Sequence, residues 1–124
     1  SASRAREVPA VVGLAWQARA VVDFDADGQN DILWQNVSNG DLYVWFMNGA
    51  SFVSGSYLSP SRLANTSWRI VRVADFDGNG DPDILFHNEA TGYLYAWYMA
   101  GLGKVGEGYA TPPQINPVWQ VAPR

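Results

Sequence analysis

Two short acidic segments hold the residues of this chain whose types and spacing are best suited to chemistry. They are DFDADGQND at residues 23–31 and DFDGNGDPD at residues 75–83. In both, oxygen-bearing side chains occupy positions 1, 3 and 5, glycine occupies position 6, and Asp occupies position 9. Calcium is a hard cation that takes about six to eight oxygen ligands, and alternate side chains of a curling backbone can point at one ion. The spacing therefore predicts one calcium site in each segment.

The ligands follow from the position of each residue in its loop. Positions 1, 3, 5 and 9 would bind through side-chain oxygens, position 7 would offer its main-chain carbonyl, and the glycine would permit the sharp bend. The predicted ligands are Asp23, Asp25, Asp27, Gln29 and Asp31 in the first loop, and Asp75, Asp77, Asn79, Asp81 and Asp83 in the second. Because Asn79 replaces an acid, the first loop is expected to bind calcium more tightly.

Other readings of the loops fit less well. An EF-hand requires Glu at position 12 between two helices, whereas position 12 here is Trp34 or Phe86. Magnesium demands tighter octahedral geometry, and zinc is disfavoured in a chain with no Cys and the single His87. Plain solvated Asp-Gly turns are the remaining alternative, but two copies in the same phase favour calcium. Without the ion the crowded carboxylates repel, so we expect a loosened metal-free form that calcium stabilises.

The loops belong to an internal repeat of 52 residues. Trp16 and Trp68 are separated by this distance, as are the two loops and the later residues Trp45 and Trp97. Residues 16–49 and 68–101 align without a gap, and about half of the aligned positions are identical. A third copy begins near Trp119, and residues 7–15 resemble the last strand of a preceding unit, so both ends of the chain fall within the pattern.

Each repeat reads as four short strands. Strands are predicted at 16–24, 32–36, 42–47 and 52–58, and again at 68–76, 84–88, 94–99 and 103–110, with turns at residues 38–41 and 90–92. The strands after each acidic loop are nearly continuous apolar runs, which indicates sheets covered on both faces. Four-stranded sheets stacked around an axis satisfy this requirement, and a period near 50 residues fits a propeller blade better than a β-sandwich.

The predicted fold is therefore all-β and consists of two four-stranded antiparallel propeller blades plus a partial strand. Residues 1–15 would be a partial outer strand or linker, 16–67 the first blade, 68–117 the second, and 118–124 the first strand of a further blade. Each repeat of this kind buries its faces on its neighbours, and about three or more repeats are usually needed. We expect three or four chains to close a ring, or the remainder of a longer propeller to complete it.

Composition narrows the classes of function. The 124-residue chain has a net charge of -4, which argues against a nucleic-acid partner. It has no apolar run of the roughly 20 residues that a membrane helix needs. No Ser/His/Asp set recurs, and the carboxylates are assigned to metal, so we expect no enzymatic activity.

Each repeat begins with Trp, continues with DFD-x-D/N-G-x-x-DIL and ends in a G-x-L-Y-x-W hairpin. This pattern resembles the FG-GAP/VCBS repeat across roughly residues 16–110. That resemblance implies calcium-binding propeller blades, as in integrin α-subunit heads, some propeller lectins and many secreted bacterial proteins. It also implies the ligand sets given above. We therefore expect an extracellular or cell-surface location, where calcium is plentiful.

Function remains open among three expectations. The first is a calcium-stabilised scaffold or adhesion module that binds a protein and self-assembles. The second is a lectin with sugar sites between blades, where the recurring Tyr43, Trp45, Tyr95 and Trp97 would stack on the ligand unless they form core. The third is a noncatalytic domain of a secreted enzyme.

Overall fold

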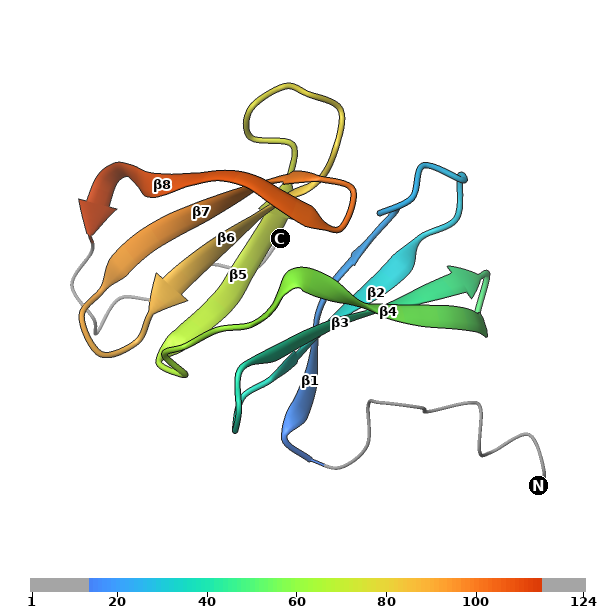
Figure 1. The fold of residues 1–124 in the computed structure, drawn as a ribbon, viewed down its shortest axis with the longest axis horizontal. Helices are drawn as coiled ribbons and strands as arrows, with labels where there is room; N and C mark the ends of the chain where they lie inside the picture. Colours follow the sequence, from blue (N-terminus) through green and yellow to red (C-terminus); the bar gives the residue numbers. More distant parts are fainter. Residues whose placement is uncertain (1–13, 115–124) are drawn as a thin grey trace.

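A computed structural model describes residues 14–114 of the chain, and its side chains through residue 110. It has eight strands, which confirms the predicted all-β class and the propeller-blade architecture. The first blade comprises β1 (Trp16–Val22), β2 (Asp31–Asn36), β3 (Asp41–Asn48) and β4 (Ser51–Arg62). The second comprises β5 (Trp68–Ala74), β6 (Asp83–Asn88), β7 (Tyr93–Ala100) and β8 (Gly103–Gln114). Figure 1 shows the two groups as twisted sheets that face one another.

Each blade is an antiparallel meander, and the two meanders have the same register. Ile32 pairs with Trp45 in blade 1, and the equivalent Ile84 pairs with Trp97 in blade 2. The first strand of each blade also carries a bulge at the same place, between Ala18 and Ala20 and between Ile70 and Arg72. The sequence repeat is therefore also a repeat of backbone geometry, which includes the strand register and the β-bulge.

The fourth strand of each blade extends beyond its prediction. β4 continues past residue 58 to Arg62, and β8 continues past residue 110 to Gln114. After a register shift, Arg62 pairs with Asp41, and its guanidinium lies 2.6 Å from the Asp41 carboxylate. The extension was not predicted, because the prolines and glycines of these segments argue against a strand. An outer strand tolerates such residues, whereas a central strand excludes them.

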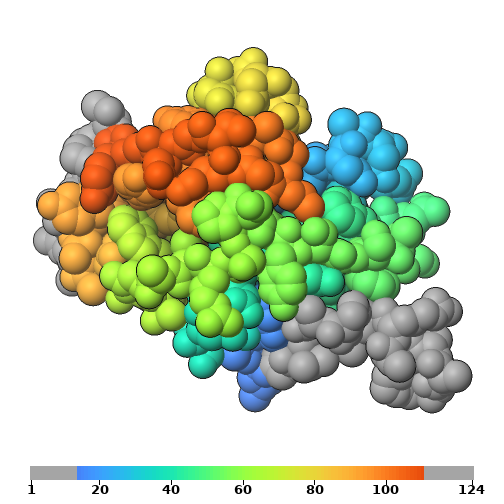
Figure 2. Space-filling model, viewed as in Figure 1, coloured from blue at the N-terminus to red at the C-terminus, as the bar shows by residue number. Residues whose placement is uncertain are grey.

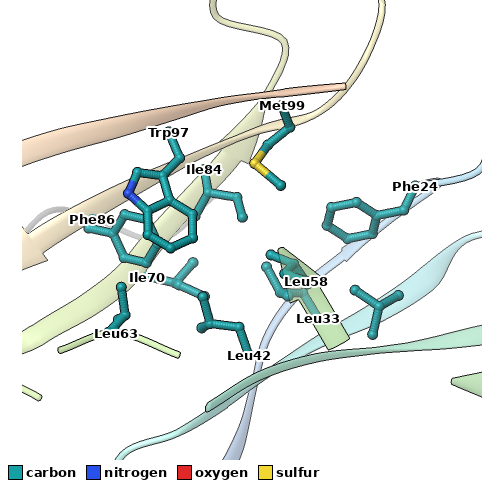
Figure 3. Close-up of a cluster of buried hydrophobic side chains, with 11 residues drawn as sticks. Phe24, Leu33, Leu42, Leu58, Leu63, Ile70, Ile84, Phe86, Trp97 and Met99 are labelled. Atoms are coloured by element: carbon teal, nitrogen blue, oxygen red, sulfur yellow. The ribbon is translucent and has the colours of Figure 1, made fainter. Parts of the chain in front are cut away.

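The hydrophobic core lies between the blades rather than within either one. Figure 3 shows Phe24, Leu33 and Leu58 of blade 1 pointing toward the side chains of blade 2, among them Ile84 and Met99. The rest of the buried cluster is Leu42, Val44, Leu63, Ile70, Phe86 and Trp97. Apolar side chains on the face that each sheet turns toward the other blade follow from this arrangement, because each sheet forms one wall of the interface.

Polar contacts join the same two sheets. The buried Gln35 donates from Nε2 to the Trp68 carbonyl at 2.8 Å and accepts from the Ile70 N–H at 3.0 Å. Arg19 donates to the Ile70 carbonyl at 2.9 Å, and Ser59 N–H donates to the Leu102 carbonyl at 3.0 Å. β5 is the last strand in the order of the sheet, so its outward main-chain groups are available for these contacts.

Two sequence expectations fall at the ends of the chain. The partial outer strand of residues 1–15 lies almost wholly outside the described residues, and the third repeat near Trp119 lies entirely outside them. Within the described part of the chain, no helix is long and apolar enough to cross a membrane.

Candidate metal centre

The two acidic loops occupy equivalent places in the blades. Each connects the first strand of its blade to the second, and both project from the same end of the paired sheets, as Figure 1 shows. In the space-filling view of Figure 2 the two loops form separate protrusions at that end. An ion bound in either loop would therefore brace the connection between the first two strands of one blade.

The carboxylates of each loop converge. One oxygen from each of Asp23, Asp25, Asp27 and Asp31 lies within 4.8 Å of the others in loop 1. In loop 2 the same holds for Asp75, Asp77 and Asp83. Side-chain positions 1, 3, 5 and 9 of loop 1 thus meet at one point, and positions 1, 3 and 9 meet in loop 2, where position 5 is the amide Asn79.

The first Asp of each loop shapes the turn. Asp23 accepts from the Gly28 N–H at 2.8 Å and from the Asp27 N–H at 3.3 Å. Asp75 likewise accepts from the Gly80 N–H at 2.8 Å, and also from the main-chain N–H groups of Gly78 and Asn79. These bonds curl the backbone around the carboxylate, which turns the following side chains toward it.

The ninth-position Asp is the buried anchor of each loop. Asp31 is 0% exposed, and its two carboxylate oxygens accept from the Phe24 and Met47 N–H groups, each at 3.0 Å. Asp83 is also 0% exposed and accepts from the Phe76 and Met99 N–H groups, each at 2.8 Å. Each carboxylate therefore ties its loop to the third strand of the blade, a role that the sequence did not reveal.

The remaining predicted ligands are held in different ways. Asn79 donates from Nδ2 to the Met99 carbonyl at 3.0 Å, and its Oδ1 accepts from the Asp81 N–H at 2.9 Å. At position 7 the Gln29 side chain accepts from the Gly49 N–H at 3.0 Å, so it braces the β3–β4 turn of the blade. The Asp81 carboxylate does not join the convergent oxygens of loop 2, consistent with a main-chain role at position 7.

The glycines at position 6 adopt backbone angles that favour glycine. Gly28 has φ = 86° and Gly80 has φ = 92°, both in the left-handed region. Position 4 is also left-handed, but there loop 2 has Gly78 at 77° whereas loop 1 has Ala26 at 61°. Loop 1 therefore stores backbone strain at Ala26.

We expect Ala26→Gly to stabilise the chain and Gly78→Ala to destabilise it. No atom lies within 4 Å of a Cβ built on Gly78, so the effect is torsional. Relief of the left-handed strain outweighs the greater chain entropy of glycine, and each change is worth about 0.5–1 kcal/mol. Urea unfolding of the two variants checks this, and shifts of the same sign would contradict it.

Each loop brings several carboxylates close together, and this crowding affects their pKa values. Partial desolvation and the neighbouring Asp27 and Asp31 raise the pKa of Asp25 above its ordinary value. Partial desolvation and the charge of Asp83 raise the pKa of Asp77, although a hydrogen bond from the Asn79 N–H opposes them. At Asp23 desolvation is the largest single influence and raises the pKa, but the hydrogen bonds to its carboxylate, led by that from the Gly28 N–H, together outweigh it and lower the pKa. A divalent cation would neutralise this mutual repulsion.

A second concave feature lies between the blades. A groove with a cavity volume of about 420 Å³ is lined by the aromatic residues Trp68, Tyr95, Trp97 and Tyr109 and by the cations Arg62 and Lys104, among others. The Lys104 ammonium lies 4.9 Å above the Trp97 ring. The basic residues of this groove were not singled out in the sequence, because they come from strand ends whose positions depend on how the blades pack.

The paired four-stranded meanders, each with one convergent acidic loop at the same end, define the chain as a propeller-type repeat protein. Comparison with known families agrees, since the FG-GAP-like repeat matches residues 23–86, just over half of the 124 residues. The chain belongs to this repeat family, as the residue pattern predicts. No curated protein and no solved structure matched the chain.

Proposed function

We propose that this chain is a noncatalytic propeller module whose two acidic loops each bind one calcium ion. The observation that carries the proposal is the convergence of four carboxylates in loop 1 and three in loop 2, at equivalent points of the repeat. Hard oxygen donors arranged around one point suit calcium, whose coordination is more flexible than that of magnesium. Within the described residues there is no thiolate, and His87 lies on a strand outside both loops.

The proposed role of calcium is structural. Asp23, Asp25, Asp27 and Asp31 would hold the first ion, and Asp75, Asp77, Asn79 and Asp83 the second, with main-chain carbonyls of Gln29 and Asp81 completing each shell. Because Asp31 and Asp83 also accept hydrogen bonds from the third strand, a bound ion is coupled to the packing of the blade. The module would act as a scaffold or adhesion unit in a calcium-rich extracellular setting, and it would self-assemble with further blades.

Thermal unfolding with and without calcium tests this proposal. Calcium at about 100 times its dissociation constant adds about 2.7 kcal/mol per site. Two such sites would raise the melting temperature of this small module by about 10 °C or more. Magnesium at the same concentration should give a much smaller shift.

Single-loop variants rank the two sites. Asp25→Asn and Asp77→Asn make the same change at position 3, and each should lower the affinity of its own loop. Because loop 1 has one more acid, calorimetry should assign the tighter of the two sites to it. The ranking would be wrong if Asp77→Asn removed the tighter site and Asp25→Asn the weaker one.

The groove between the blades supports a second candidate function, carbohydrate binding. Tyr109 is 57% exposed and packs edge-on to Tyr95 with ring centroids 4.7 Å apart, so the groove presents an aromatic surface beside the charged groups of Lys104 and Arg62. Trp97 is 6% exposed and belongs to the core, which leaves Tyr109 as the better stacking residue. A glycan array in calcium tests this, with Tyr109→Ala as the control that should abolish any signal from the groove.

A further inference from the structure

The two faces of a blade have different neighbours. Figure 3 shows that blade 1 turns one face toward blade 2, and we call this face the front. It includes Leu33, Gln35 and Leu42. Blade 2 contributes residues of its opposite face to the same interface, namely Ile70, Ile84, Phe86 and Trp97. Because side chains alternate along a strand, the front of blade 2 points away from blade 1. It is formed by the equivalents of the blade 1 residues and by a neighbour in register, namely Leu85, His87, Leu94 and Ala96.

The front of blade 2 is largely buried, although no described strand packs on it. His87 and Ala96 are each 5% exposed, and Leu85 and Leu94 are half-buried. Among residues 14–114, the strands outside blade 2 all belong to blade 1, which packs on the other face. These side chains are buried in a single copy of the chain. Their burial therefore points to a cover from the same chain, outside the described residues.

The covered part of this face is narrow. Phe24, at the loop end of the front of blade 1, is 3% exposed and packs in the core between the blades. Its equivalent in blade 2, Phe76, is 44% exposed. A whole blade on this face would bury Phe76 as blade 2 buries Phe24. A single strand that passes over His87 and ends before loop 2 accounts for both exposures.

His87 also has an unmet hydrogen-bonding requirement at this place. It occupies the position of Gln35, which donates to the Trp68 carbonyl and accepts from the Ile70 N–H of β5. Among the described residues, the buried Nε2 atom of His87 has no hydrogen-bond partner. Leaving a buried polar atom unpaired is costly, and an imidazole nitrogen can bind a main-chain carbonyl or N–H. A strand equivalent to β5 would supply such groups.

The segment after β8 has the sequence and the position of such a strand. Residues 119–121 read WQV, where residues 68–70 at the start of β5 read WRI. Residues 63–67 join β4 to β5, and residues 115–118 separate β8 from Trp119. The second connection is one residue shorter than the first. The segment can therefore reach the front of blade 2 as β5 reaches the front of blade 1.

We propose that residues 118–124 dock on the front of blade 2 as a single strand. Trp119 and Val121 face blade 2, as their equivalents in β5 face blade 1. The main chain between them supplies the partner of His87. The segment thereby covers apolar surface that would otherwise face solvent. This inference goes beyond the proposed function, because it depends neither on calcium nor on association between chains.

Chemical modification of His87 tests this proposal, because it is the only histidine in the chain. Diethyl pyrocarbonate acylates accessible imidazoles, and mass spectrometry gives the rate at His87 in the intact chain. Val121→Asp places a charge on the side that faces blade 2, so it should raise this rate about tenfold or more. Gln120→Asp is the matched control. The same charge at the preceding residue points away from blade 2 and should leave the rate near that of the wild type.

Trp119→Ala gives a second test with a milder change. It should raise the rate in the same direction as Val121→Asp, while the circular dichroism of both variants stays that of the folded wild type. The proposal is overturned if His87 stays protected in both variants. It is also overturned if His87 reacts only when both variants lose their β-sheet signal, because the docked strand should detach without unfolding the blades.

Two further results would assign the cover to another segment or chain. Protection of His87 that falls when the wild type is diluted would show that a second copy covers this face. Residues 1–13 lead into β1 of the other blade, so Val11→Asp should leave the rate unchanged. A rise with Val11→Asp alone would show that the N-terminal segment is the cover. Either result overturns the proposal.

Discussion

Replacing Asp31 by Ala should destabilise the calcium-free chain by about 2–5 kcal/mol. The side chain is 0% exposed, and its removal leaves the Phe24 and Met47 N–H groups buried without an acceptor. Each such group costs about 1–3 kcal/mol. Because a small domain has only about 5–15 kcal/mol of stability, this single change removes a large share of it. Urea unfolding in the presence of a chelator, followed by circular dichroism, measures the effect.

Asp27→Ala is the matched control for this prediction. It removes a carboxylate from the same cluster, but Asp27 is exposed, and its carboxylate accepts from the Gln29 N–H rather than from buried main-chain groups. Without calcium it should change stability little, or raise it slightly by relieving repulsion. With calcium both variants should lose the ion-dependent stabilisation. Equal effects of the two substitutions in chelator would show that Asp31 has no separate structural role.

The second large effect is expected for Gly40→Ala in the β2–β3 turn. Gly40 has φ = 88°, and a Cβ built on it would lie 2.4 Å from the Leu63 main-chain oxygen. The Gly40 carbonyl also accepts from the Leu63 N–H at 2.9 Å, which anchors the segment between the blades. Backbone strain of about 1–2 kcal/mol and the loss of a hydrogen bond worth about 1 kcal/mol add to the clash. We therefore expect a loss of at least about 3 kcal/mol.

Gly49→Ala separates the clash from the strain. Gly49 also has a positive φ, 60°, but no atom lies within 4 Å of a Cβ built on it. Its substitution should cost only about 1 kcal/mol. The denaturation midpoints of the two variants give the comparison directly. Similar midpoints would mean that the segment at Leu63 moves away at no cost.

The repeat made much of this fold predictable from the sequence. Positions 52 residues apart share strands, turns and loops, and the DxD spacing alone predicts both clusters of converging oxygens. Local patterns of this kind depend on residues near in the chain. The conformation of a loop or turn can therefore be predicted from the sequence of one repeat, and the second repeat gives an independent check.

The contacts between the blades could not be predicted in the same way. Leu33 and Ile84 both lie in the core between the blades, but they belong to opposite faces of the repeat unit. The alternation of side chains along a strand does not predict which face of one blade packs on which face of the other. The roles of Gln35 and Arg19 depend on main-chain groups of β5 in the other blade. The double hydrogen bonding of Asp31 likewise depends on β3, which follows the loop by many residues.

Calorimetric titration of the stripped protein with calcium tests the central claim most directly. Two converging acidic loops predict about two ions per chain, and removal of one loop through Asp23→Ala and Asp25→Asn together should reduce the count to one. The loops would be plain solvated turns, and the proposed calcium role would fail, if the stripped wild-type chain took up no calcium at concentrations typical of extracellular fluid.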